Sequence, residues 1–376
     1  MNADRELIHR LEEYARGLLE GSPACHDWEH TLRVRRIAKR LAKAEGADLM
    51  VVEAAALLHD IGRPAELADC GKTCHAELGA KMVREALPQL GVSDKEFIER
   101  VASCVLTHRY RKRNPERFPQ SIEAKVIFDA DKLDGIGAIG IARSFHFAGR
   151  IGAKIHNREE EALSDDSYSK EDSAFREYLV KLRHVRSKLL TDSGRAMAEG
   201  RHSFMEEFFK ELNLEAYGYQ VAIALGGNIG DVEQTFKKAV EMLSEELYDI
   251  KVADVITTKP VDCVPGTPDF KNTVLVASYD GTPQELLAIC QNIERALGRP
   301  AQHSSQESRT IDLDIILFGD KEIYRPNLTI PHPRMYMREF VLRPLAQLAP
   351  EWKIPSIGLT VREQLEGIER LQNQQK

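Results

Sequence analysis

The chain has 376 residues, of which 43 % are hydrophobic and 30 % charged, and its formal net charge is −7. That length leaves room for two or three domains of ordinary globular composition, and the acidic balance argues against nucleic acid as a general partner. No apolar run approaches the roughly 18 residues of a membrane span, and the N-terminus has no apolar signal region. Six cysteines in such a chain make no disulfide framework, so we expect reduced thiols, a cytoplasmic location and no membrane partner.

The first 215 residues or so predict one helix after another. Val34, Ile37, Ala38 and Leu41 recur at helical spacing, and residues 51–59 form another apolar helical run. A third helix is indicated by Val101 and Val105 and extends to His108, whereas strand-like alternation is scarce. We therefore expect an all-α domain over residues 1–215.

Histidines and aspartates in this half are spaced as ligands on separate helices. His59 and Asp60 close the apolar helix, His30 lies upstream, and Asp131 lies downstream in the run Phe128–Asp134. Neutral imidazole and carboxylate together suit a buried transition metal or magnesium in a helical bundle. The pattern predicts a divalent metal site.

The order His30, His59-Asp60, Asp131 resembles the HD superfamily of metal-dependent phosphohydrolases, over residues 20–212. The runs 26–30, 57–61 and 129–143 look like its bacterial nucleotide-pyrophosphatase branch. The resemblance implies a divalent transition metal such as Mn²⁺ or Fe²⁺ bound by His30, His59, Asp60 and Asp131. Bound water would then attack a phosphate ester or anhydride. His75 and His108 fall where binuclear members place two more histidines, so the sequence is compatible with one metal or two.

Two further patterns in this half have alternative interpretations. The basic run 109–113 is either a solvated loop or a rim that gathers phosphate, and its position directly after His108 favours the rim. Gly135, Gly137 and Gly140 fit the G-x-G-x-x-G spacing of a dinucleotide-binding turn. An aspartate-rich segment and helical flanks argue against that reading. We expect these glycines to let helices pack closely beneath Asp131.

The sequence pattern changes near residues 215–219 from helical to mixed α and β, which predicts a second domain over 219–376. Residues 221–225 form a short apolar run, a helical segment follows through Leu243, and 252–257 and 273–277 indicate further strands. Thr282-Pro283-Gln284-Glu285 is a good helix start, with a threonine cap, proline at the first position and glutamate at the third. Its buried stripe would comprise Leu286, Ile289, Cys290, Ile293 and Leu297.

Acidic and apolar residues alternate from Arg309 to Phe318, which is typical of a half-buried strand. Asp312 and Asp314 would project from one face while Ile311, Leu313 and Ile315 enter a core. Two carboxylates at that spacing can grip one or two hard cations, and these can hold a polyphosphate. Arg309 adds a fork for phosphate oxygens, and Gly319-Asp320 suits a tight hairpin turn.

Five ordered motifs of this half resemble 6-hydroxymethyl-7,8-dihydropterin pyrophosphokinase, over about 219–360. They are Leu225–Asn228, Asp269–Asn272, Gly298-Arg299, Arg309–Asp314 and Pro331–Met335. The resemblance implies an α+β, ferredoxin-like, three-layer domain that moves diphosphate from ATP to a pterin alcohol, giving AMP. With the first half, the chain would be a multidomain fusion for folate biosynthesis whose HD domain acts on a phosphorylated pterin or nucleotide.

The same resemblance assigns roles to individual residues. Asp312 and Asp314 would bind two Mg²⁺ ions and, with Arg299 and Arg309, form the catalytic set. The ATP site would also include Gln291, Glu294, Ile315, Thr329, His332 and Arg338. Phe270 and Phe340 would sandwich the pterin ring, and Asn272 and the backbone near Thr258 and Val261 would bind its edge. Diphosphate transfer needs positioning and charge neutralisation more than covalent chemistry, which suits such a set.

The sequence departs from that family at two places. Gly227 stands where serine is usual, and Ser305–Ser308 replace an Arg-Trp-Gly-Pro run from a loop that closes over ATP. Loss of a phosphate-directed arginine would slow transfer by orders of magnitude while binding persists. The alternative is therefore a nucleotide pyrophosphatase that carries a degenerate pterin- and ATP-binding module.

Overall fold

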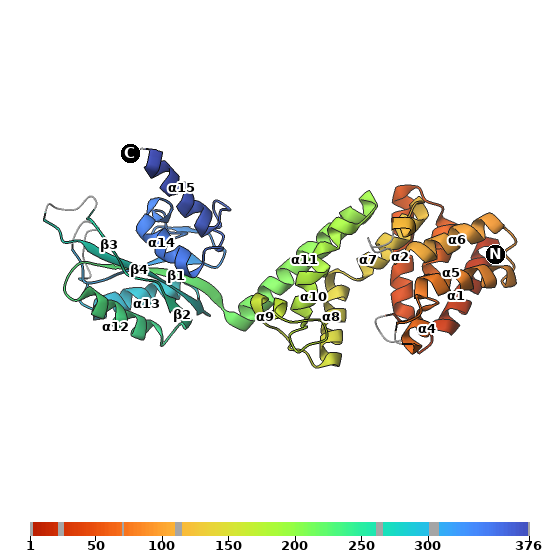
Figure 1. The fold of residues 1–376 in the computed structure, drawn as a ribbon, viewed down its shortest axis with the longest axis horizontal. Helices are drawn as coiled ribbons and strands as arrows, with labels where there is room; N and C mark the ends of the chain where they lie inside the picture. Colours follow the sequence, from red (N-terminus) through yellow and green to blue (C-terminus); the bar gives the residue numbers. More distant parts are fainter. Residues whose placement is uncertain are drawn as a thin grey trace. The chain divides into compact units, whose positions relative to one another are not determined.

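The structure is a computed structural model that describes residues 3–21, 26–69, 71–109, 115–260, 266–300 and 308–374. The chain forms two compact units, Met1–Glu211 and Leu212–Lys376 (Figure 1). We expected the boundary at 215–219; the division falls a few residues earlier, within helix α11 (Asp192–Tyr217). In the part of the chain that is described, no helix is both long and apolar enough to cross a membrane.

The first unit is helical, as predicted, and no strand occurs among its described residues. Its helices before α11 are α1 (Ala3–Leu19), α2 (Trp28–Glu45), α3 (Leu49–Leu58), α4 (Arg63–Ala68), α5 (His75–Gln89), α6 (Lys95–Thr107), α7 (Ile122–Asp134), α8 (Gly137–Ile151), α9 (Glu159–Leu163) and α10 (Ala174–Val180). The three helices expected from apolar spacing are α2, α3 and α6. Asp27, Asp48, Asp94 and Ser121 begin α2, α3, α6 and α7 by accepting backbone N–H groups.

Helix α3 lies at the centre of the bundle. Every residue from Val51 to Leu58 is buried, and α3 packs against α1, α2, α6 and α7. A helix that is apolar on all sides is stable only when others surround it. Because His59 and Asp60 directly follow α3, they are delivered to the interior of the bundle.

The second unit has three layers, as predicted. The strands are β1 (Tyr219–Gly227), β2 (Tyr248–Val252), β3 (Ile256–Thr258), β4 (Phe270–Tyr279) and β5 (Asp312–Phe318), with a separate pair β6 (Ile323–Arg325) and β7 (Leu328–Ile330). Antiparallel pairing gives the order β2-β4-β1-β5, with β3 also on β4. Helices α12 (Val232–Leu243) and α13 (Pro283–Ala296) share one core with the sheet; α14 (Glu339–Leu348) and α15 (Val361–Gln374) share the other (Figure 1).

Several local predictions for this unit are confirmed and two need correction. Thr282 and Glu285 form a reciprocal capping box, and Ile311, Leu313 and Ile315 are buried. The expected strand over 252–257 is wrong, because β2 ends at Val252 and β3 begins at Ile256. The hairpin at Gly319-Asp320 is also wrong: the chain turns there, but β6 pairs with β7 rather than with β5.

Candidate active sites

The predicted histidines and aspartates of the first unit come together inside the bundle. His30 lies in the first turn of α2, His75 begins α5, and His108 directly follows α6. Asp131 lies near the end of α7 and faces His30 and His59. His59 and Asp60 directly follow α3. All four of these histidines and Asp60 are at most 1 % exposed. We call His30, His59, Asp60, His75, His108 and Asp131 the histidine–aspartate site.

An oxygen atom fixes the Nδ1 atom of each histidine in this site. The partners are Asp134 Oδ2 for His30 (2.7 Å), Ala56 O for His59 (2.8 Å), Glu66 Oε2 for His75 (2.7 Å) and Val105 O for His108 (2.6 Å). A carbonyl or carboxylate oxygen accepts, so Nδ1 carries the proton. Each neutral ring therefore presents the lone pair of Nε2, which is the form that binds a metal.

The Nε2 atoms face one another around Asp60. The distance between them is 3.2 Å for His30 and His59 and 3.1 Å for His75 and His108. Asp60 Oδ2 lies 3.7 Å from the first pair, and Oδ1 lies 3.4 and 3.7 Å from the second. Asp60 Oδ1 is buried and accepts no hydrogen bond from the described residues. Facing lone pairs repel unless a cation lies between them, so the donor set fits divalent metal, which these histidines and Asp60 would hold.

Burial keeps the imidazoles of His59 and His75 neutral. It lowers the pKa of His59 to about 4 and that of His75 to about 3. Burial alone would raise the pKa of Asp60, but His59 and the other surrounding groups outweigh it and hold that pKa well below its usual value. At neutral pH His59 and His75 therefore offer uncharged nitrogens, and Asp60 offers an ionised carboxylate.

The aspartates of the run 128–134 have three different roles. Asp131 faces the site, with Oδ1 3.6 Å from His30 Nε2, whereas Asp134 accepts from His30 Nδ1 and from Arg33. Asp129 is buried and accepts from the backbone N–H groups of Leu190 and Thr191, each at 2.8 Å. Asp129 therefore ties α7 to the segment before α11 and takes no part in the metal site.

A cavity of about 610 Å³ opens over the histidine–aspartate site. Six cationic side chains line it: Arg63, Arg109, Lys132, Arg143, Arg150 and Lys181. Arg109 also pairs with Glu66, the carboxylate that orients His75. Three carboxylates, Asp131, Asp172 and Glu177, line the cavity as well, so the cations outnumber the acids. This excess of positive charge beside the candidate metal ligands suits an anionic substrate such as a polyphosphate. The rest of the basic run, 110–113, lies outside the described residues.

The carboxylate pair of the second unit lies on β5, beside three basic side chains. Asp312 pairs with Arg299 and with Arg309, whose Nη1 is 3.1 Å from Oδ2, and His332 Nε2 lies 3.8 Å from Asp314 Oδ2. Burial, with Asp312 beside it, raises the pKa of Asp314 to about 6. A divalent cation would relieve this repulsion, and carboxylate oxygens are ligands that Mg²⁺ prefers. The donors present therefore fit magnesium.

Glu294 connects α13 to this pair. Its Oε1 accepts from the Leu313 backbone N–H at 2.6 Å and also contacts Arg299. Gln291 lies on the exposed side of α13, and Thr329 is half-buried on β7. The Ile315 side chain is in the core, so only its backbone is available to a ligand.

The residues expected to bind the pterin lie beside the arginines expected to bind phosphate. Asn272 Nδ2 donates to Thr258 Oγ1 at 2.9 Å, and Thr258 pairs with Phe270 across β3 and β4. The guanidinium of Arg309 lies 5.4 Å from the Phe270 ring centre, and that of Arg338 lies 5.3 Å from the Phe340 ring centre. Val261 lies outside the described residues.

Comparisons with known proteins match both units. A family model described as "HD domain" matches residues 27–136, and one described as "7,8-dihydro-6-hydroxymethylpterin-pyrophosphokinase (HPPK)" matches 222–350. The uncharacterized protein YpgQ of Bacillus subtilis is 35 % identical over 210 residues, covering 56 % of this chain and 93 % of its own. The pyrophosphokinase of B. subtilis is 40 % identical over 131 residues, covering 34 % of this chain and 77 % of its own. The chain is a fusion of an HD domain and an HPPK domain.

A solved structure of the B. subtilis protein YpgQ in complex with ADP is also similar to the HD domain. It is 32 % identical, covers 56 % of this chain and 96 % of its own, and superposes with a TM-score of 0.44.

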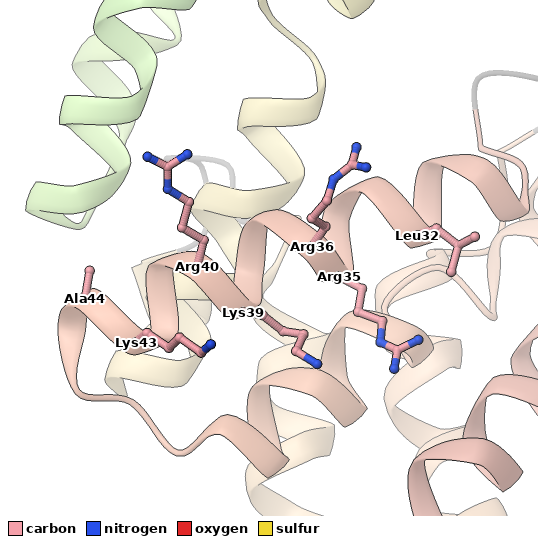
Figure 2. Close-up of a pocket in the computed structure, with 7 residues that line it drawn as sticks. All are labelled: Leu32, Arg35, Arg36, Lys39, Arg40, Lys43 and Ala44. Carbon is pink, nitrogen blue, oxygen red and sulfur yellow. The ribbon is translucent and has the colours of Figure 1, made fainter. Parts of the chain in front are cut away.

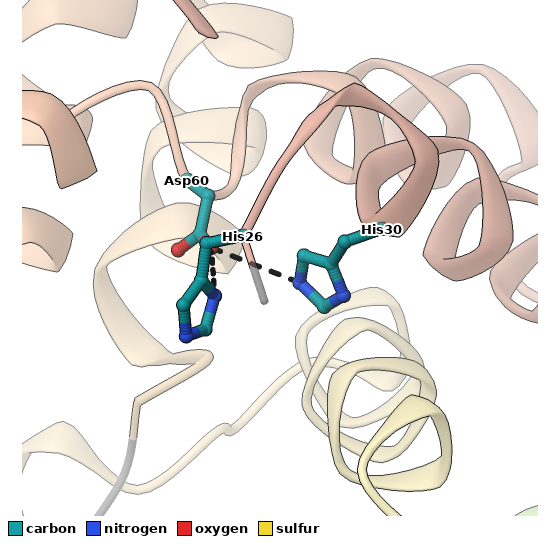
Figure 3. A group of neighbouring side chains, drawn as sticks. All are labelled: His26, His30 and Asp60. Carbon is teal, nitrogen blue, oxygen red and sulfur yellow. Dashed lines mark hydrogen bonds and ion pairs between the residues drawn. The ribbon is translucent and has the colours of Figure 1, made fainter. Parts of the chain in front are cut away.

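The sequence analysis placed His26 in the run 26–30 but assigned it no role at the metal site of the HD domain. His26 Nδ1 lies 3.0 Å from Asp60 Oδ2, and His30 faces that same oxygen (Figure 3). The available signal was the i, i+4 spacing of His26 and His30, although His26 precedes the helix that carries His30.

In the HPPK domain the structure gives Asn228 and Gly227 specific roles. Asn228 Oδ1 accepts from the Arg309 backbone N–H at 2.8 Å, and its own N–H donates to Arg309 O at 3.0 Å. A Cβ on Gly227 would lie 2.6 Å from the carbonyl oxygen of Thr310. The segment that leads into Asp312 thus packs directly on Gly227, which accounts for glycine where the family commonly has serine.

The glycines of the false dinucleotide-binding pattern pack helices together, as expected. Gly135 ends α7, Gly137 begins α8, and no strand precedes them. A Cβ on Gly140 would lie 2.3 Å from the carbonyl oxygen of Gly135. The close approach of α7 and α8 under Asp131 therefore requires glycine.

Gly62→Ala is expected to destabilise the HD domain by about 1–3 kcal/mol and to lower its metal content. The new Cβ would lie 2.4 Å from the carbonyl oxygen of His75, so the start of α5 and the His75 ring must shift. Guanidinium denaturation and metal analysis of the purified protein measure both effects. Gly17→Ala in α1 is the matched control, because its Cβ would meet nothing within 4 Å. Equal stability and metal content for Gly62→Ala and the control would contradict the prediction.

Proposed function

We propose that the HPPK domain transfers diphosphate from ATP to 6-hydroxymethyl-7,8-dihydropterin, with two Mg²⁺ ions on Asp312 and Asp314, and releases AMP. Membership of the HPPK family supports this reaction. The observation that carries the residue assignment is the carboxylate pair on β5 with Arg299, Arg309 and His332 around it. Bound Mg²⁺ would neutralise the charge on the phosphates.

The protein's own side chains would bind and orient the two substrates. Arg299 and Arg309 now pair with Asp312, and the triphosphate is the anion that they would contact once metal neutralises that carboxylate. Phe270 and Phe340 offer flat aromatic faces for a flat heterocycle, with Asn272 at its edge. Because Arg309 lies against Phe270 and Arg338 against Phe340, the two subsites are adjacent, as a direct transfer needs.

We further propose that the HD domain hydrolyses a phosphate ester or anhydride of a pterin or a nucleotide. Four Nε2 lone pairs converging on buried Asp60 carry this assignment. A bound divalent transition metal such as Mn²⁺ or Fe²⁺ would supply a water of lowered pKa. The basic cavity over the site supports an anionic phosphate substrate.

Product analysis of the full-length protein tests the kinase assignment. Incubation with ATP, Mg²⁺ and the pterin alcohol should give AMP and pterin diphosphate in equal amounts. Binding of both ligands without release of AMP would instead support a degenerate binding module, consistent with the altered segment Ser305–Ser308.

The substrate of the HD domain is tested separately in a protein whose kinase is silenced by Asp312→Ala. This variant is incubated with Mn²⁺ and either dihydroneopterin triphosphate or deoxynucleoside triphosphates. Faster cleavage of the pterin would support a role in the same pathway as the kinase. A wide preference for nucleotides would contradict that role and support general nucleotide hydrolysis.

A further inference from the structure

Two aromatic side chains line the cavity over the histidine–aspartate site, together with some of that site's own residues. The rings of Phe147 and Tyr168 meet edge to face, with centroids 5.5 Å apart and planes inclined by 71°. Both line the same cavity as His75, His108 and Asp131. The guanidinium of Arg150 lies 5.4 Å from the centre of the Phe147 ring. The cavity therefore has an aromatic wall in addition to its cations.

Tyr168 is held in this wall by an unusual backbone. Its side chain is 73 % exposed, and its φ of +70° lies in the left-handed region that L-residues rarely adopt. The Tyr168 N–H donates to Asp172 Oδ2 at 2.7 Å, and buried Asp172 is itself paired with Arg176. The Tyr168 ring is not part of a hydrophobic core, so packing does not account for its disfavoured backbone conformation. Residues held in disfavoured backbone conformations concentrate at ligand-binding positions.

Helix α8 carries both cationic and aromatic residues of the cavity along one of its faces. Arg143, Phe147 and Arg150 all face the cavity, at helical spacing. Arg143 Nη1 lies 3.6 Å from Asp134 Oδ2, the atom that accepts from His30. Phe147 lies about one helical turn beyond Arg143, about 6 Å along the axis of α8. A ligand with its phosphates near Arg143 would therefore bring its remaining part to Phe147 and Tyr168.

We propose that Phe147 and Tyr168 form the ring-binding subsite of the histidine–aspartate site. They take the planar heterocycle of a substrate whose polyphosphate lies along Arg63, Arg109, Lys132 and Arg143. The inference rests on the proposed phosphohydrolase function and adds which residues receive the flat ring of the substrate, either a nucleobase or a pterin. Stacking on aromatic side chains tolerates either heterocycle, because each has a π-face.

The test compares substrates with and without a ring in the full-length Asp312→Ala protein. The probes are dGTP, dihydroneopterin triphosphate and inorganic tripolyphosphate, each with Mn²⁺. Phe147→Ala and Tyr168→Ala should lower kcat/KM for the two ring-bearing substrates about 10- to 100-fold, mainly through KM. In the same two variants, kcat/KM for tripolyphosphate should stay within about twofold of the parent's value. If tripolyphosphate is not cleaved, its inhibition constant is compared instead. Tyr168→Phe keeps the ring, so it should lower kcat/KM for the ring-bearing substrates by less than Tyr168→Ala does. The parent's preference between dGTP and the pterin assigns the ring.

Two controls separate this subsite from general damage. Arg143→Ala should weaken all three probes together, whereas Phe204→Ala, at an exposed aromatic on α11, should change none. Equal losses for tripolyphosphate in Phe147→Ala and Tyr168→Ala, or unchanged kinetics with both ring-bearing substrates, would overturn the ring subsite alone. If the parent cleaves no probe, the proposed phosphohydrolase function fails and the subsite fails with it.

A groove of about 760 Å³ along α2, lined by Arg35, Arg36, Lys39, Arg40 and Lys43, is a second positively charged feature (Figure 2). Arg35 and Lys39 are already paired with Glu53. No ligating or aromatic group lines this groove, so it contributes nothing to the ring subsite.

Discussion

Asp312→Ala is expected to abolish AMP formation from ATP and the pterin alcohol while the protein stays folded. Asp312 and Asp314 are the only carboxylates that β5 projects from its half-buried face among the described residues, and removal of one halves the metal-binding oxygens there. Metal stabilisation of transferred charge is worth several kcal/mol, and each 1.36 kcal/mol is a factor of ten in rate. We therefore expect kcat to fall by at least about 10³-fold.

The measurement is AMP release by chromatography, with far-UV circular dichroism to establish folding. Asp312→Asn keeps the shape and removes the charge, and it should be nearly as inactive as the alanine variant. Asp320→Ala, in the turn directly after β5, is the matched control and should keep the parent's rate. A tenfold loss or less in both Asp312 variants would contradict the assignment of Asp312 as a magnesium ligand.

Local patterns sufficed to predict the strand that carries this site. On a strand with one buried face, alternation is read directly from the sequence, and Ile311, Leu313 and Ile315 are buried where Asp312 and Asp314 are not. The helix start at Thr282 was equally predictable, because a capping box involves residues only three apart. The Gly319-Asp320 turn was read correctly as a turn, but its pairing depends on β7, which no local signal specifies.

The order of the ligands along the chain was predictable, but their orientation was not. Asp134 and Glu66 fix the rings of His30 and His75 through contacts that span 104 and 9 positions in the sequence. Nothing near His30 indicates that its partner lies at the end of α7. The same is true of Tyr168, which reaches the cavity from a segment far from every ligand motif. Such residues are found from packing, because distant elements are brought together only by the fold.

Asp60→Ala is expected to remove bound metal from the HD domain and to abolish its hydrolytic activity, without affecting AMP formation. Asp60 is the one residue whose two carboxylate oxygens face both histidine pairs among the described ligands. Without that negative charge, the carboxylate of Asp131 is the one anionic group left in the defined histidine–aspartate site, which is too little to compensate divalent metal there. We expect metal content to fall to about a tenth of the parent's, and phosphate release to fall with it, since the attacking water depends on the metal.

Elemental analysis of protein loaded with Mn²⁺ and then desalted measures the metal, and the kinase assay on the same sample shows that the chain is intact. Glu29→Gln, at an exposed acid next to His30, should keep both metal and hydrolysis. Asp60→Asn keeps the side-chain shape and removes the charge, so it distinguishes the effect of lost charge from that of a cavity left by alanine. It should behave like the alanine variant. If both Asp60 variants retain the parent's metal, the assignment of Asp60 as a metal ligand is wrong. If they lose metal but still hydrolyse phosphates at the parent's rate, the histidine–aspartate site is not where hydrolysis occurs.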